Sequence, residues 1–361
     1  MFDIRFYMKA HGLRRELKRG AKISANDLFD RLESFRDKKP VVYNIETTNA
    51  CNMKCEMCPR TTMMTRRVKT LDRATFLKIV DQIQPHSEHL WGLWEKFVKD
   101  EYGIPGDAMS ENHFFLYIIP RVLQLHGYGD PLLDKHMSEY IKVLTQRNIP
   151  SYFSCNPANI EVDKMTEMFE NGLSYVKYSL ESVDDILHKK IRGEASNFTE
   201  SYRRILKLLE AKARNKFRTA VVITMLDLNR AGQREEYEQL KEAFKGLDVY
   251  IYIKSEDQQW YRKDYHGTGS IHWSEFCKHP WMSMTIKSNG EAAMCMEDFN
   301  NEIILGDATK ESLYDIWNGK KYEKFRRDHI DLTPGMKCTE QCDMKLIGHF
   351  LRSETKVKGT S

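Results

Sequence analysis

The sequence of 361 residues has no apolar run long enough to cross a membrane, and its first residues lack the apolar core and small-residue cleavage site of a signal peptide. Its net charge is only +4, with basic residues spread among nearly as many acidic ones, which gives no reason to expect a nucleic-acid partner. Cysteine is scarce: eight in the whole chain are too few for a disulfide scaffold. We therefore expect a globular protein of the cytoplasm, without a membrane or nucleic-acid partner.

What is present is a compact group of thiols. Cys51, Cys55 and Cys58 lie within eight residues, whereas the next cysteine, Cys155, is about a hundred residues away. Four protein ligands close a structural zinc site or an electron-transfer iron–sulfur cluster, while a centre that performs chemistry keeps one position open. Three thiols in one loop therefore favour a reactive metal centre. A zinc knuckle with a distant fourth ligand, or cysteines present for packing, are the alternatives.

The loop and its surroundings, ETTNACNMKCEMCPR, resemble the cluster-binding loop of the radical S-adenosylmethionine (SAM) family, in its SPASM-bearing branch. The resemblance implies a [4Fe–4S] cluster held by three cysteines, with one iron free for SAM. It further implies that an electron from the cluster cleaves SAM to a 5′-deoxyadenosyl radical, which takes a hydrogen atom from the substrate. A flavodoxin or ferredoxin would supply the electron.

Short β-branched runs alternate with amphipathic helices after residue 40. Strands are expected at 41–48, 122–125, 151–154, 175–180, 220–225 and 249–253, with helices near 72–83, 135–147, 162–170, 199–214 and 234–246. This alternation favours parallel βαβ units, and hence an α/β fold. Six strands predict a partial (β/α)6 TIM-like barrel, which is also the fold that the resemblance implies. Active sites of such barrels lie at the C-terminal ends of the strands.

The expected domain plan has four parts. Residues 1–38 form an N-terminal helical segment, 39–255 the radical SAM barrel, 256–345 a small SPASM or twitch domain for an auxiliary cluster, and 346–361 a polar tail. The barrel carries a long aromatic-rich insertion at about 85–120. Such a connection is either a binding loop or lid, or an extra helix at 90–100 packed by its aromatic face.

The N-terminal segment contains one clear helix signal at about residues 24–38. Ser24 or Asn26 would cap it, and Leu28, Leu32 and Phe35 form an apolar stripe. The stripe either packs on the rest of its own chain or, together with the preceding basic residues, lies on an anionic membrane.

The glycine-rich segment HGYGDPLL, at 126–133, follows the second strand. Glycines allow the backbone to approach a ligand closely. The segment resembles the family's Gly-Gly-Glu-Pro motif, and the resemblance implies that Gly127, Gly129, Asp130 and Pro131 meet the amino group of SAM. Asp130 stands where the family usually has glutamate, so its carboxylate reaches less far. Met57, in the cysteine loop, stands where relatives place an aromatic residue, and its thioether can pack on the adenine.

The fourth strand and the following helix supply three further candidate contacts to SAM. Ser179 and Glu181 would share one strand face, because side chains two apart point the same way. Their hydroxyl and carboxylate suit the ribose or the polar end of SAM. Arg192 suits its carboxylate through charge-assisted hydrogen bonds, although an arginine at a helix end is often only a surface charge.

The remaining cysteines return after residue 270. Cys277 and Cys295 bracket a hairpin-like segment with a turn at 288–290, and Cys338 and Cys342 follow as a close pair. Four thiolates complete the ligand set of one [4Fe–4S] cluster or of zinc. The region resembles the SPASM or twitch extension of radical SAM enzymes. The cluster in this region would relay electrons and shape the pocket wall. Alternatively, a cluster or zinc there would only stabilise a small domain that lacks its own core.

Three functions fit these features. The first is dehydrogenation or epimerisation of a polar small molecule, such as an amino sugar or aminocyclitol, with Cys155 returning a hydrogen atom in the second case. The second is modification of a residue in a peptide or protein, which the roughly forty residues ahead of the barrel make less expected, since peptide-directed relatives often carry a longer leader-binding domain there. The third is a metal-binding scaffold without catalysis, which the SAM motifs argue against. The oligomeric state is not predicted.

Overall fold

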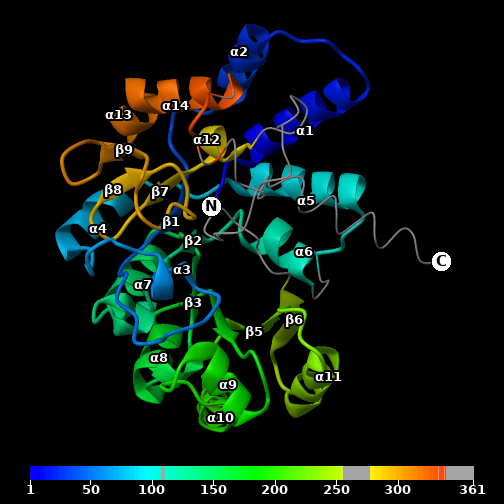
Figure 1. The fold of residues 1–361 in the computed structure, drawn as a ribbon, viewed down its shortest axis with the longest axis vertical. Helices are drawn as coiled ribbons and strands as arrows, with labels where there is room; N and C mark the ends of the chain where they lie inside the picture. The colour runs from blue at the N-terminus through cyan, green and yellow to red at the C-terminus, as the bar shows by residue number, and fades with distance from the viewer. Residues whose placement is uncertain (107–109, 255–276, 332, 337, 339–361) are drawn as a thin grey trace.

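The computed structural model describes residues 1–106, 110–254, 277–331, 333–336 and 338 (Figure 1). Cys342, the predicted domain boundary at 255/256 and the predicted polar tail at 346–361 lie outside these ranges.

Six parallel strands form the larger part of one sheet and confirm the predicted α/β fold. In chain order they are β1 (Val42–Ile45), β2 (Leu123–Gln124), β3 (Ser151–Cys155), β4 (Tyr175–Ser179), β5 (Ala220–Leu226) and β6 (Tyr250–Lys254). Each strand pairs in parallel with the next. β1 and β2 are shorter than predicted.

Helices between the strands cover one face of this sheet (Figure 1). They are α4 (Arg73–Val80), α7 (Met137–Gln146), α8 (Val162–Glu170), α9 (Asp185–Arg192), α10 (Phe198–Asn215) and α11 (Gln233–Ala243). α7 shows why they form: Met137, Tyr140, Ile141 and Leu144 recur at helical spacing and are all buried. Parallel pairing brings the C-terminal ends of all six strands to one edge, where the loops that follow them meet.

The sheet continues beyond β1 into the C-terminal region. β7 (Met284–Ile286) pairs with β1 in parallel, and β8 (Glu291–Ala293) and β9 (Ile304–Asp307) add antiparallel strands. The turn predicted at 288–290 joins β7 to β8, with the Gly290 N–H bonded to the Lys287 carbonyl at 2.8 Å. Helices α12 (His279–Met282), α13 (Leu313–Asn318) and α14 (Lys320–Ile330) complete the described part of this region.

A second core lies under the N-terminal helices α1 (Ile4–Lys18) and α2 (Ala25–Phe35). Ser24 is the N-cap of α2, as one of the two predictions had it, and accepts a bond from the Asp27 N–H. Leu28 and Leu32 are buried within the chain's own core. α1 lies in the predicted N-terminal helical segment 1–38, but its bounds were not predicted, because its apolar residues are interleaved with basic ones.

The aromatic-rich insertion forms an extra helix, α5 (Glu88–Tyr102), followed by the short α6 (Glu111–His113) and a π-helical turn at Phe114–Ile118. Trp94 is fully buried, meets the Tyr7 ring of α1 edge to face at 5.1 Å, and donates its indole N–H to the Leu116 carbonyl at 2.6 Å. The insertion thus contains the extra helix of the second alternative, which was expected to pack on the barrel, and its aromatic residues contact α1. None of the described helices is long and apolar enough to cross a membrane.

Candidate active site

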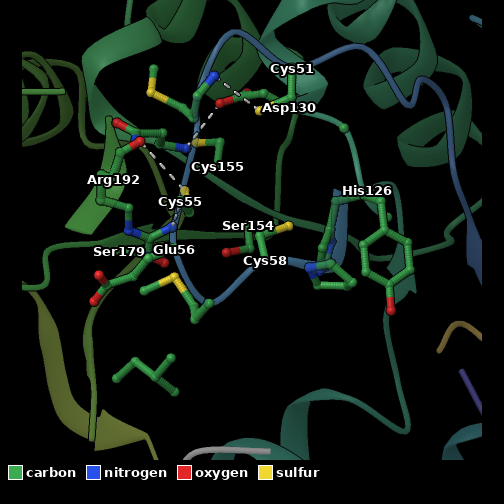
Figure 2. A pocket seen from close by; sticks show the side chains of 18 of the residues that line it. Cys51, Cys55, Glu56, Cys58, His126, Asp130, Ser154, Cys155, Ser179 and Arg192 are labelled. Atoms are coloured by element: carbon green, nitrogen blue, oxygen red, sulfur yellow. Dashed lines mark hydrogen bonds between the residues drawn. The ribbon is translucent and has the colours of Figure 1, made fainter. Parts of the chain in front are cut away.

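A cavity of about 740 Å³ opens at the C-terminal ends of the parallel strands (Figure 2). This volume lies within the usual range for small-molecule sites. Residues from the loops after β1, β2 and β3 and from the ends of β4, β5 and β6 line it. The lining includes Cys51, Cys55, Met57, Cys58, Gly127, Gly129, Asp130, Cys155, Ser179 and Arg192 from the predicted set.

The cysteine loop lies on the C-terminal end of α9. The Lys54 N–H donates to the Arg192 carbonyl at 3.1 Å, and the Glu56 N–H donates to the Ile191 carbonyl at 2.9 Å. Gly193, which ends α9 at a φ of +98°, passes so close that an added Cβ would be 2.9 Å from the Lys54 nitrogen. These contacts fix the backbone between the three cysteines, whose side chains all reach the cavity (Figure 2).

Burial controls the protonation of these thiols. It raises the pKa of Cys51, and it raises the pKa of Cys58 to about 11. Without a metal the two thiols therefore keep their protons near neutral pH, and metal binding must displace them. Among the described residues, no three histidine, cysteine or carboxylate side chains are arranged around a single metal ion.

The glycine segment needs its glycines for a reason visible in the structure. A Cβ on Gly129 would lie 2.2 Å from the Thr48 carbonyl oxygen and 2.7 Å from that of Ala50, both backbone atoms just before Cys51. A Cβ on Gly127 would lie 2.5 Å from Glu46 Oε1. The segment thus fits tightly against the approach to the cysteine loop, and the Asp130 N–H bonds the Ala50 carbonyl at 2.8 Å.

Replacing Gly129 by alanine should therefore displace the entry to the cysteine loop. We expect the free energy of unfolding to fall by about 1–3 kcal/mol, the usual cost of overpacking, together with weaker SAM binding. Gly92→Ala is the matched control, because no atom lies within 4 Å of its added Cβ on α5. Denaturant unfolding and equilibrium dialysis with SAM would measure both variants. If Gly129→Ala and Gly92→Ala had the same free energy of unfolding and the same affinity for SAM, the predicted role of Gly129 beside the cysteine loop would be wrong.

Asp130 ties the glycine segment to the end of β3. Its carboxylate accepts bonds from the Leu132 N–H, from the Asn156 N–H at 3.1 Å and from Asn159 Nδ2 at 2.8 Å. Burial raises its pKa against these hydrogen bonds. Pro131 is buried and starts the short 3₁₀ turn Pro131–Leu133. Asp130 therefore links the loop after β2 to the loop after β3 by direct hydrogen bonds.

Glu181 and Arg192 form a buried ion pair, but only Arg192 and Ser179 line the cavity among the three residues predicted from this segment. β4 ends at Ser179, so Glu181 lies beyond the strand and does not continue its alternation. Its exposed fraction is 1%, and its second oxygen accepts the Leu226 N–H at 2.6 Å. Arg192 also reaches the cysteine loop, with Nη1 at 3.5 Å from Cys55 Sγ.

Sequence reasoning missed Glu46, a fully buried carboxylate at the end of β1. Arg66 binds both of its oxygens, at 2.8 and 2.9 Å, and the N–H groups of Tyr128 and Ser288 donate to it at 3.0 and 3.1 Å. Lys287, also buried, lies near the same carboxylate. One side chain thus joins the exit of the cysteine loop, the glycine segment and the β7–β8 hairpin.

Asn156 is a second residue that the sequence did not reveal. It lines the cavity directly after Cys155, its Oδ1 accepts the Ala158 N–H and the Ser196 hydroxyl, and its Nδ2 has no hydrogen-bond partner among the described residues. Its adjacency to Cys155 at the end of a strand was the signal that could have found it.

The described C-terminal thiols approach one another around α14. The Cys277 N–H donates to His329 Nε2 at 3.2 Å, and Cys338 Sγ lies 3.9 Å from His329 Nδ1. Burial, with the charges of Cys277 and Cys295, raises the pKa of Cys338. Cys277 and Cys338 thus lie on either side of His329, a buried histidine that the sequence did not suggest, and the charges of Cys277 and Cys295 act on Cys338.

Three thiols in the loop after β1 and a glycine segment after β2, both at one end of a parallel sheet, are the arrangement that the predicted iron–sulfur and SAM sites require. The comparisons with known proteins identify the class. The model of the radical SAM superfamily matches residues 45–240, and that of SPASM, an iron–sulfur cluster-binding domain, matches residues 277–343. The chain belongs to the radical SAM superfamily. Its cofactors are SAM, a [4Fe–4S] cluster and auxiliary iron–sulfur clusters in the SPASM region.

Three solved structures illustrate the likeness of the fold. A histidine-tagged form of anSMEcpe with bound AdoMet has a TM-score of 0.54 at 10% identity, covering 88% of this chain and 92% of that chain. SuiB from Streptococcus suis has a TM-score of 0.51 at 12% identity, covering 89% and 78%. BtrN in complex with AdoMet and 2-DOIA has a TM-score of 0.47 at 15% identity, covering 83% and 91%. No curated protein matches the sequence.

The described residues fit these cofactors. Three soft thiols reach one cavity, and the backbone beside them is glycine where a Cβ would clash. The cavity wall also carries Arg192 and an unpartnered amide N–H of Asn156, groups suited to the carboxylate and hydroxyl oxygens of SAM.

Proposed function

We propose that this enzyme abstracts a hydrogen atom from a polar small molecule, such as an amino sugar or aminocyclitol, and so dehydrogenates or epimerises it. When bound and reduced, the [4Fe–4S] cluster supplies the electron that cleaves SAM to methionine and a 5′-deoxyadenosyl radical. Cys51, Cys55 and Cys58 would hold that cluster. Gly127, Gly129, Asp130, Pro131, Ser179, Arg192 and Met57 would position SAM, and a flavodoxin or ferredoxin would donate the electron.

The observation that supports a polar substrate is a set of neutral polar side chains at the ends of successive strands, in a wall that also carries charged residues such as Arg192, Arg230 and Lys254. His126 follows β2, Ser154 is in β3 and Ser179 ends β4, and all three line the cavity with the cysteines (Figure 2). Burial, helped by the Lys177 charge, lowers the pKa of His126 to about 3, so its imidazole is neutral. A neutral imidazole and two hydroxyls can hydrogen-bond the hydroxyl or amino groups of a small molecule without demanding a charge.

The predicted role of the C-terminal region is to take or pass electrons. Cys277, Cys295, Cys338 and Cys342 would hold one auxiliary cluster. The contacts of Cys277 and Cys338 with the same residue, His329, support this, and Cys342 lies outside the described residues. A dehydrogenation removes two electrons and two protons in all. The hydrogen atom leaves with the 5′-deoxyadenosyl group, the remaining electron needs an acceptor, and the remaining proton goes to solvent.

The test is anaerobic incubation of the reduced protein with SAM and panels of amino sugars, aminocyclitols and peptides. We expect 5′-deoxyadenosine to rise with a polar small molecule. A product lighter by two hydrogens would indicate dehydrogenation, and a product that carries one solvent deuterium would indicate epimerisation. Turnover with peptides alone would overturn the proposal in favour of a peptide maturase, and persistent absence of 5′-deoxyadenosine would favour a scaffold.

Cys155 separates the two reactions. It ends β3, lines the cavity and is 6% exposed, and burial raises the pKa of its thiol well above the ordinary value, so it keeps its S–H hydrogen. If the reaction is an epimerisation, this thiol returns a hydrogen atom to the substrate radical, and the thiyl sulfur then takes up an electron from the reductant and a proton from water.

Replacing Cys155 by alanine should then abolish the epimerised product and the incorporation of solvent deuterium. Cys155→Ser is the matched variant, because it retains a small polar side chain but its stronger O–H bond does not give up a hydrogen atom readily. Both variants should still form 5′-deoxyadenosine. Unchanged product and unchanged deuterium content in Cys155→Ala would exclude Cys155 as the donor.

A further inference from the structure

We propose that Arg192 sets the reduction potential of the loop cluster by direct contact with the sulfur of Cys55, and that Glu181 limits this effect by balancing its charge. The inference concerns the cluster that the family brings to the loop, and it does not depend on the identity of the substrate. Arg192 would therefore affect the reduction potential of the cluster already in the protein without SAM.

The contact between Arg192 and Cys55 is direct. Arg192 Nη1 lies 3.5 Å from Cys55 Sγ, which is within hydrogen-bonding range for sulfur, and Figure 2 shows the two residues side by side. The Arg192 carbonyl is 3.7 Å from the same sulfur and also accepts the Lys54 N–H at 3.1 Å. The backbone and the side chain of one residue therefore enclose the sulfur of one predicted cluster ligand.

Glu181 holds the guanidinium in this place. One of its oxygens accepts a hydrogen bond from Arg192 Nη2, and the other accepts the Leu226 N–H at 2.6 Å. The side chain of Arg192 is 16% exposed and that of Glu181 is 1% exposed. Because the carboxylate is anchored to the end of β5, the guanidinium cannot swing into solvent without leaving Glu181 buried and unpaired, which is costly.

The consequence for the cluster follows from electrostatics. Reduction adds one negative charge to the cluster, and N–H donors to its sulfur ligands and nearby positive charges stabilise that added charge. Because the site is largely buried, water screens the interaction weakly. Arg192 therefore raises the reduction potential. Glu181, on the far side of the guanidinium from the sulfur, carries the opposite charge and lowers it, so the pair adjusts the potential without adding net charge.

The alternative is that Arg192 acts only when SAM is present, through the carboxylate of SAM. The two roles differ in their timing. A contact to Cys55 changes the potential of the cluster in the protein without SAM, whereas a contact to SAM changes the affinity for SAM and leaves the potential of the SAM-free cluster as it was. Measurement without SAM therefore separates them.

The experiment is an EPR-monitored redox titration of the holoprotein without SAM. The signal of the loop cluster is identified as the one absent from the variant in which Cys51, Cys55 and Cys58 are alanine. We expect Arg192→Gln to shift its midpoint potential to a more negative value and Glu181→Gln to shift it to a more positive value. Arg73→Gln on α4, which removes an equal charge from an exposed ion pair with Glu139, should cause no shift.

Two results would overturn the proposal: an unchanged midpoint potential in Arg192→Gln, or shifts of the same sign in Arg192→Gln and Glu181→Gln. If Arg192→Gln fails to hold its cluster, Arg192→Lys takes its place. Lysine keeps the charge but lacks the fork that reaches Cys55 and Glu181 together, so its midpoint potential should fall below the wild-type value. A wild-type potential in Arg192→Lys would then count against the proposal.

Discussion

Simultaneous replacement of Cys51, Cys55 and Cys58 by alanine is expected to abolish the formation of 5′-deoxyadenosine from SAM. These three thiols are the cysteines that line the cavity on the loop after β1, and no other side chain of that loop supplies a thiolate ligand. With two [4Fe–4S] clusters in the wild type, the iron content should fall from about eight to about four atoms per chain. Anaerobic iron and sulfide analysis with EPR spectroscopy would measure this.

Cys155→Ala is the control for the loss of a cavity cysteine that is not a predicted ligand. It should keep the full iron content. If the wild type instead holds about four irons and the triple variant almost none, the C-terminal thiols hold no cluster, and an oxidation relayed through them is excluded. If the triple variant keeps all of its iron, the prediction that Cys51, Cys55 and Cys58 hold a cluster is wrong.

Replacing Glu46 by glutamine should produce a large loss of stability. The substitution leaves Arg66 and Lys287 buried beside a neutral amide, and breaking a buried ion pair in this way costs about 3–5 kcal/mol in the free energy of unfolding. Because Glu46 also bonds the Tyr128 and Ser288 N–H groups, weaker binding of SAM should accompany the loss. Chemical denaturation would measure the difference against Glu139→Gln, a control that breaks an exposed ion pair with Arg73 and should change the stability little.

The same residue predicts a pH dependence. Burial alone would raise the pKa of Glu46, but hydrogen bonds from Arg66 and the charges of Lys287 and Arg66 outweigh burial and lower the pKa to about 2. A carboxyl group with a lowered pKa in the folded state stabilises the protein above its unfolded pKa, and this contribution is lost as the pH falls through the folded value. The wild type should therefore lose stability between about pH 4.5 and pH 2, and Glu46→Gln should lose less over that interval. Equal slopes for the two proteins would contradict this account.

Local features were predictable from the sequence. The spacing of Cys51, Cys55 and Cys58 is a property of one short loop, and the strand and helix pattern follows from side-chain periodicity. The glycines at 127 and 129 were also found, although the clash that requires them was not visible, because the atoms they approach belong to Glu46, Thr48 and Ala50 in another strand and loop.

Features that depend on distant pairing escaped prediction. The partners of Glu46 come from three separate segments, and no local sequence pattern indicates that Arg66 and Ser288 donate hydrogen bonds to it. Glu181 was expected to face the cavity by strand alternation, but β4 ends at Ser179 and the chain turns, so its carboxylate meets Arg192 instead. The bounds of helix α1 were not predicted, because its apolar residues pack in part against elements far along the chain, α5 of the insertion and α12.

The pairing of β7 with β1 has a consequence for biosynthesis. Val42 is in register with Met284, whose N–H donates to the Val41 carbonyl at 2.8 Å, so one side of β1 stays an open strand edge until residues near 284 have left the ribosome. Open edges recruit other strands, including those of neighbouring nascent chains. The sheet can therefore be completed only after the β7–β8 hairpin has been synthesised, late in translation. Truncation ahead of β7 should give a chain prone to aggregate, and a chaperone that shields β1 during synthesis would increase the yield of folded protein.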